Sequence, residues 1–226
     1  MFSPSADVLI RIGCEFIDLV DTFLKDPTLI NTEFINCKRL LGSGEIERGE
    51  GNGVIRDSLS AFWEQFYITS CSGTDLKVPV LQPRLGELEW KAVALVFIWG
   101  YKKFKYYPFK LAPVFYQSIL NPAVETIADD ELLENFKMFL SVGERRLVEM
   151  VIKNFDEVDK EELVDFLCEH EVRNIPTKEN ICQVMTAIAH KELVREPMYV
   201  IKIFRETIDQ HKHICNLTSD LFKWYA

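Results

Sequence analysis

The residues best suited to chemistry lie near the end of the chain, where His211, His213 and Cys215 alternate. A nucleophilic cysteine needs a lowered pKa and a nearby base, and either histidine could supply that base. Short tail motifs of this kind also arise by chance, so we expect a thiol without a catalytic role. Cys215 is the single catalytic candidate, and the sequence leaves open whether the chain is an enzyme.

The same residue types could also bind a metal ion. Zinc ligands are usually spaced as C-x₂₋₄-C or H-x₃₋₅-H, and this sequence contains neither pattern. Cys182 and His190 would lie two helical turns apart, too far to share one ion without other ligands. We therefore expect no metal and no cofactor, and we expect Cys168 and Cys182 to pack as small hydrophobic side chains.

Two further patterns could indicate catalysis or phosphate binding. Asp129-Asp130-Glu131 and Glu161-Glu162 group carboxylates, but both stand at expected helix starts, where they stabilise the helix dipole. The glycine turn of residues 49–53 could cradle a phosphate, but no Lys-Ser/Thr pair follows it, and Glu47 and Glu50 would repel the anion. We interpret these patterns as helix-start carboxylates and a structural turn.

Composition narrows the class of protein. The chain has 226 residues, 48% of them hydrophobic, enough for one generous domain or two packed subdomains. Its net charge of −9 argues against nucleic acid as a partner. The most apolar window, residues 92–99, is too short to span a bilayer. Six cysteines without a C-x-x-C pair fit reduced thiols, so we expect an intracellular protein, cytoplasmic or nuclear, without a membrane segment.

Hydrophobic periodicity predicts an α+β fold that is predominantly α-helical. Asp26-Pro27 should end the first helix, Asp57 or Ser58 should start the second, and Gly100 should end the third. The eighth helix should begin with Thr177 as N-cap and Asn180 at the third position. The expected elements are a strand within 29–40 and helices over 6–25, 58–68, 85–100, 111–120, 129–140, 144–155, 160–169, 176–195 and 198–210.

Four local patterns follow one another between about residues 30 and 210. They are an acidic glycine turn leading into an aromatic helix (GEGNGVIRDSLSAFWEQF), a buried helix with Gly100 near its end and Pro108 behind it, an Asp-Asp-Glu-Leu helix after a proline-bearing linker, and the segment IPTKENICQVMTAIAHKEL. Their order and spacing resemble the N-terminal lobe of HECT-type ubiquitin ligases. The resemblance implies one HECT N-lobe-like domain over 1–226, bilobal, with a larger helical subdomain (about 1–121 and 173–226) and a smaller helical insert (about 122–172).

In that family, a cysteine of a separate C-terminal lobe takes ubiquitin from a ubiquitin-conjugating enzyme and passes it to a substrate lysine. The resemblance therefore implies a ubiquitin-protein ligase-like domain that docks a ubiquitin-conjugating enzyme and is inactive alone, since this sequence does not include the catalytic lobe. His213-Ile214-Cys215-Asn216 is similar to the family's His-Thr-Cys-x-Asn setting, with Ile214 in place of the threonine.

The resemblance places the docking surface on the insert, where a partner would place aromatic or aliphatic residues in an apolar groove. A small subdomain needs most of its apolar residues for its own core, so we expect at most half of the candidates to be exposed. Two other hypotheses stay open: an interaction module of the same fold without a ubiquitin role, and an independent enzyme that uses Cys215. The candidates for partner binding are Leu132, Phe136, Phe139, Leu140, Leu147 and Met150.

Overall fold

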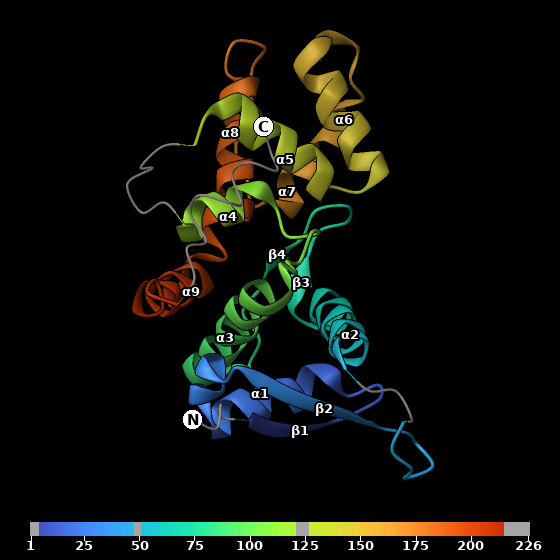
Figure 1. Cartoon of the computed structure of the whole chain (residues 1–226). Coiled ribbons are helices and arrows are strands. Elements are labelled where there is room, and N and C mark those ends of the chain that lie inside the picture. The colour runs from blue at the N-terminus through green and yellow to red at the C-terminus, as the bar shows by residue number, and fades with distance from the viewer. Residues whose placement is uncertain (1–4, 48–50, 121–126, 215–226) are drawn as a thin grey trace. The chain divides into compact units, whose positions relative to one another are not determined.

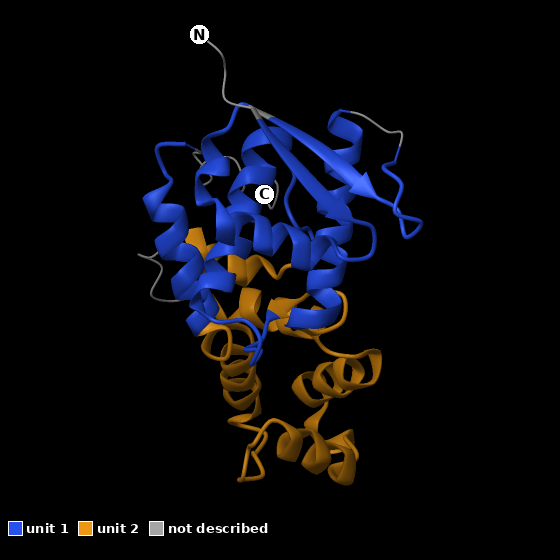
Figure 2. Cartoon of the chain, turned by 90° about the horizontal axis from the view of Figure 1, so that it is seen from below, with its two compact units in different colours: residues 1–71, 79–109, 199–226 blue, residues 72–78, 110–198 orange. Residues whose placement is uncertain are grey.

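The computed structural model describes residues 5–47, 51–120 and 127–214. The described chain is mostly helical and contains two small two-stranded sheets (Figure 1), which confirms the predicted α+β, mainly helical class. The chain forms two compact units, coloured separately in Figure 2. Unit 1 comprises residues 1–71, 79–109 and 199–226, and unit 2 comprises residues 72–78 and 110–198.

Unit 1 begins with a strand, a helix and a second strand that pairs in parallel with the first. Ser5 lies opposite Phe34, and Arg11 lies opposite Leu40. A parallel pair needs a crossover connection, which a helix and a 3₁₀ turn provide here. The elements are β1 (Ser5–Arg11), α1 (Glu15–Lys25), η1 (Pro27–Asn31) and β2 (Phe34–Leu40).

The helix predicted over residues 6–25 is wrong in its first half. Val8 and Ile10 are buried while Leu9 between them is exposed, and this alternation is the period of a strand. Gly13 then takes a positive φ of 87°, which breaks the chain before α1 starts. The sequence suggested one helix because the apolar residues of both segments also fit a helical stripe.

Three longer helices complete unit 1 and form its aromatic core. Trp63 packs edge-to-face on Phe66 at 5.3 Å between ring centres, and Phe66 packs the same way on Trp90 at 6.1 Å. Such edge-to-face pairs add to the stabilisation from burial alone. The helices are α2 (Asn52–Ser70), α3 (Glu87–Phe104) and α9 (Met198–Gln210), whose first residue belongs to unit 2.

The predicted start of α2 and the predicted end of α3 differ from the structure. Helix α2 starts after Gly51, whose φ is 89°, and not at Asp57 or Ser58. Helix α3 continues past Gly100 and ends at Phe104, and its C-cap Lys105 takes the left-handed conformation. Gly100 instead allows close packing, because a Cβ there would lie 3.4 Å from the Leu59 side chain.

Unit 2 is a set of helices with well-defined starts. Ser141 and Glu144 form a reciprocal capping box at the start of α6, and Asp159 accepts hydrogen bonds from the backbone of residues 161 and 162 at the start of α7. The Thr177 N–H donates to Asn180 Oδ1 at 2.7 Å, but α8 begins at Ile181 with Asn180 as its N-cap, so the prediction of Thr177 as N-cap is wrong. The elements are α4 (Pro113–Leu120), α5 (Asp129–Phe139), α6 (Val142–Lys153), η2 (Phe155–Glu157), α7 (Lys160–Glu169), α8 (Ile181–His190) and the π-helix η3 (Lys191–Arg195).

Unit 2 extends further at both ends than the insert expected at about 122–172. The structure groups residues 110–198 together because α4 and α8 both pack against α5. A short loop, residues 72–78, also belongs to this unit. It is flanked by the paired two-residue strands β3 (Cys71–Ser72) and β4 (Val78–Pro79).

Candidate functional site

The structure buries most of the side chains predicted to bind a partner. Leu132, Phe136, Phe139, Leu140 and Leu147 are each at most 8% exposed, whereas Met150 is 48% exposed. Phe136, for example, stacks on Phe139 and packs edge-on against His170 within unit 2. These five residues form the core of their own unit, so Met150 is the candidate whose side chain can meet a partner without rearrangement.

Other exposed apolar residues lie on the same part of unit 2. Val142 (65% exposed) begins α6, and Met150 lies eight residues later, which places both within one side of the helix. Arg146 stands between them, also exposed. Met138 (41% exposed) lies near the end of α5, three residues before Ser141, the N-cap of α6. We call Val142, Arg146 and Met150 the α6 face.

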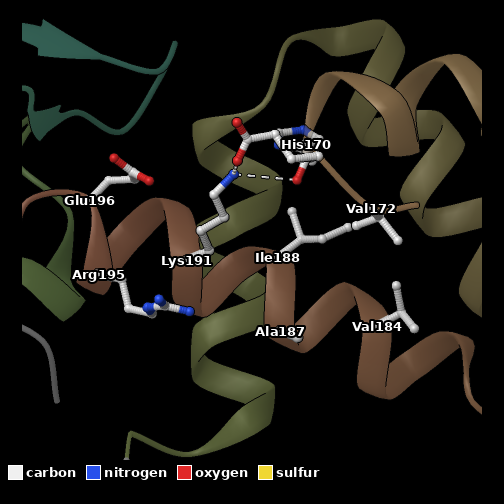
Figure 3. Close-up of a pocket in the computed structure, with 9 residues that line it drawn as sticks. His170, Val172, Val184, Ala187, Ile188, Lys191, Arg195 and Glu196 are labelled. Carbon is white, nitrogen blue, oxygen red and sulfur yellow. Dashed lines mark hydrogen bonds and ion pairs between the residues drawn. The ribbon is translucent and has the colours of Figure 1, made fainter. Parts of the chain in front are cut away.

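A pocket of about 560 Å³ opens in unit 2 beside the helix formed by α8 and η3 (Figure 3). Val172, Val184 and Ile188 form its apolar part. The turn that follows α7 forms one side, and one face of α8 and η3 forms the other. The remaining lining residues are His170, Glu171, Ala187, Lys191, Arg195 and Glu196.

Charged groups are grouped at one end of this pocket. Lys191 Nζ donates to Glu171 Oε2 at 2.6 Å and to the His170 carbonyl at 3.4 Å, as the dashed lines of Figure 3 show. The hydrogen bond with Glu171 raises the pKa of Lys191, and the same bond lowers the pKa of Glu171. Glu171 holds a φ of 63°, an uncommon conformation outside glycine.

His170 connects the pocket to the core. Its Nδ1 lies 3.0 Å from Glu192 Oε1, and its ring packs against Phe136 and Phe166. The buried Nε2 has no hydrogen-bond partner among the described residues. The carboxylate fixes the orientation of the ring, as in many catalytic histidines. None of the described lining residues is a serine, threonine or cysteine.

The π-helix determines which side chains reach the pocket. The Glu196 N–H donates to the Lys191 carbonyl at 2.9 Å, a bond five residues back instead of four. π-helical turns are rare in proteins, but many of those that occur lie at functional sites. The side chain of Arg195, on the same turn, makes no hydrogen bond or ion pair within the part of the chain that the structure describes. The pocket can therefore bind an apolar group beside an anion.

Sequence analysis missed this pocket, although it placed a helix over 176–195. Hydrophobic periodicity does not distinguish a π turn from an α turn. It also gives no sign that the residues after α7 return to this helix. The Lys191-Glu192 and Arg195-Glu196 pairs were the available signal, and on a helix such pairs usually face solvent.

The cysteines fall in different environments. Cys168 and Cys182 are exposed, so the prediction that they pack as small hydrophobic side chains is wrong. Cys37 is buried, and burial raises the pKa of its thiol. Cys215 lies outside the described residues. Within the described ranges, no three His, Cys, Asp or Glu side chains are grouped so that they could hold a metal ion.

No protein-family model matches the chain, and no curated protein matches its sequence. The resemblance to the HECT N-terminal lobe therefore stays a prediction from the order of its motifs. Among the described helices, none is both long enough and apolar enough to cross a membrane.

Proposed function

We propose that this chain is a docking domain of the HECT-type ubiquitin-ligase kind, and that unit 2 binds a ubiquitin-conjugating enzyme. The domain contributes binding and no chemistry of its own. The observation that supports this proposal is the α6 face, where Val142 and Met150 are exposed on one side of a helix. Exposed apolar side chains beside a cation are typical of the centre of a protein interface.

Exposed charges of both signs lie on or beside the α6 face, so they fit a partner surface that carries both charged and apolar groups. Arg146 is exposed between the two apolar residues, and Glu149 lies beside Met150. Arg145, by contrast, is already engaged, since it bonds to Asp75 at 2.7 Å and to the Lys137 carbonyl at 2.6 Å. The free charges on this face are therefore available to orient a partner, while Arg145 holds α6 against α5.

Variants of the buried candidates would not test this proposal. Phe136 is fully buried, and Leu147 is only 5% exposed. Truncating a buried phenylalanine costs about 3–5 kcal/mol, so Phe136→Ala would weaken binding through unfolding alone. Leu147→Asp would in addition bury a charge.

The test is a calorimetric titration of the full chain with a panel of ubiquitin-conjugating enzymes. We expect at least one to bind, and we expect Met150→Glu to weaken that binding by about tenfold or more, as for a central interface residue. The matched control is Ile175→Glu, because Ile175 is 70% exposed in unit 2 but does not lie on α6. The Ile175→Glu variant should bind the conjugating enzyme with the affinity of the wild type.

Two outcomes would contradict the proposal. If no conjugating enzyme binds to the folded chain, the ubiquitin role is refuted, and an interaction module of the same fold without that role becomes the better account. If one binds but Met150→Glu and Ile175→Glu weaken it equally, the α6 face is not the docking surface.

A further inference from the structure

We propose that the N-terminal end of α2 and the cavity beside it form a binding site for a phosphate group. The site belongs to unit 1, so it is separate from the docking surface proposed for unit 2. The cavity has a volume of about 230 Å³, which is enough for a phosphate and part of the molecule that carries it. It is lined by Glu33, Ile35, Asn52, Ile55, Trp99, Lys103 and Phe104.

The first contribution comes from the helix itself. Helix α2 has 19 residues, and no side chain caps its N-terminus, because the N-cap residue is Gly51. The backbone N–H groups of residues 52–54 have no acceptor within the described ranges. Free N–H groups and the positive end of the helix dipole together favour a bound anion.

The second contribution comes from Trp99 of α3, which lies in the wall of the cavity. Its side chain is 2% exposed, and its indole N–H finds no acceptor among the described residues. A buried donor without a partner is unfavourable, so such groups are rare in proteins. An oxyanion in the cavity would supply the missing acceptor.

The third contribution is a half-buried cation. Lys103 Nζ donates to the Glu33 carbonyl at 2.6 Å, which leaves two of its three N–H groups for another acceptor. Burial and the neighbouring Lys102 lower the pKa of Lys103, and the attraction of the Glu33 carboxylate offsets this only in part. A bound phosphate would add negative charge beside this half-buried ammonium group.

Charges of both signs surround the cavity. The carboxylate of Glu33 lines the cavity and opposes binding. Arg56 adds a second cation near the cavity, with its guanidinium 5.6 Å above the Phe104 ring. Glu47, which the sequence suggested would repel phosphate, is paired with Arg39 at 3.4 Å, and Glu50 lies outside the described residues.

The test uses inorganic phosphate and the full chain. Phosphate is titrated against chloride at constant ionic strength, and the ¹H–¹⁵N spectrum is followed, with the Trp99 indole signal assigned from Trp99→Phe. We expect the Trp99 indole and the amides of residues 52–54 to shift with one common dissociation constant. Lys103→Met should raise that constant by about tenfold, as for the loss of a hydrogen bond to a charged group.

The control is Lys91→Met, because Lys91 lies on the same helix but pairs with Glu87 at 2.5 Å. It should leave the dissociation constant unchanged. The proposal is overturned if the Trp99 indole signal does not move with phosphate, or if Lys91→Met and Lys103→Met weaken the shifts equally. Each variant is folded if its amide signals outside the site match those of the wild type.

Discussion

Replacing Gly73 by alanine should destabilise unit 2 far more than a single methyl group normally does. Gly73 lies in the loop of residues 72–78, which is bonded to the end of α5. The Thr74 N–H donates to the Phe139 carbonyl at 2.9 Å, and the Leu76 N–H donates to the Met138 carbonyl at 3.0 Å. Thr74 Oγ1 also donates to the Leu140 carbonyl at 2.6 Å. The loop therefore satisfies carbonyls that the helix end leaves unpaired.

The cost of Gly73→Ala has two parts. Gly73 has a φ of 95°, and a side chain in that region costs about 1–2 kcal/mol. An added Cβ would also lie 2.5 Å from Phe139 Cδ2 and closer than 3.0 Å to the Leu76 carbonyl oxygen, which is backbone and cannot rotate away. Overpacking of this kind costs about 1–3 kcal/mol. We therefore expect the free energy of unfolding to fall by about 2–5 kcal/mol.

The assay is urea unfolding followed by helical circular dichroism and by tryptophan fluorescence. Trp63, Trp90 and Trp99 all lie in unit 1, so a loss confined to unit 2 appears in the dichroism more than in the fluorescence. Gly143→Ala is the control, because a Cβ there meets nothing within 4 Å and the residue lies in the first turn of α6. The free energy of unfolding of the Gly143→Ala variant should rise by up to about 1 kcal/mol. A Gly73→Ala variant within about 0.5 kcal/mol of the wild type would refute the reasoning.

Three further predictions concern unit 1 and the thiols. Glu15→Ala should lower the unfolding free energy by about 3–5 kcal/mol in urea, because the buried Glu15 carboxylate accepts from Gln65 at 2.5 Å and from Arg39 at 3.4 Å; a loss below about 1 kcal/mol would contradict this. Burial raises the pKa of Asp18, but hydrogen bonds from Arg11 outweigh it and hold that pKa below the ordinary 3.8. Its stabilising effect is therefore present above pH 3.8 and lost as the pH falls through the lower folded value, so Asp18→Asn should flatten the acid limb of stability against pH; an unchanged limb would refute the assignment. Iodoacetamide should modify exposed Cys182 well before buried Cys37 in mass spectrometry, and equal rates would contradict the burial.

Much of the helical architecture could be predicted, because local signals determine helix boundaries. The acidic residues at 129–131 and 161–162 do lie in the first turns of α5 and α7. Asn180 does bond back to Thr177. These features depend on neighbours a few residues apart, which a sequence displays directly.

Long-range contacts account for what could not be predicted. Val8 and Ile10 form a strand only because residues 34–40 pair with them in parallel. The six docking candidates share one helical pattern, and that pattern does not tell which side faces the core. Trp99 lies beside the start of α2 through the packing of unit 1, so no local motif could reveal a donor set there.

The most direct test of the docking proposal is a titration of methyl-labelled methionines with the conjugating enzyme that binds tightest. The chain has five methionines, of which Met138 and Met150 are exposed and Met185 is fully buried in the same unit. We predict that the Met150 methyl signal shifts on binding, together with that of Met138, while Met185 stays in place. Binding that leaves Met150 unshifted would contradict the proposal that the α6 face receives the partner.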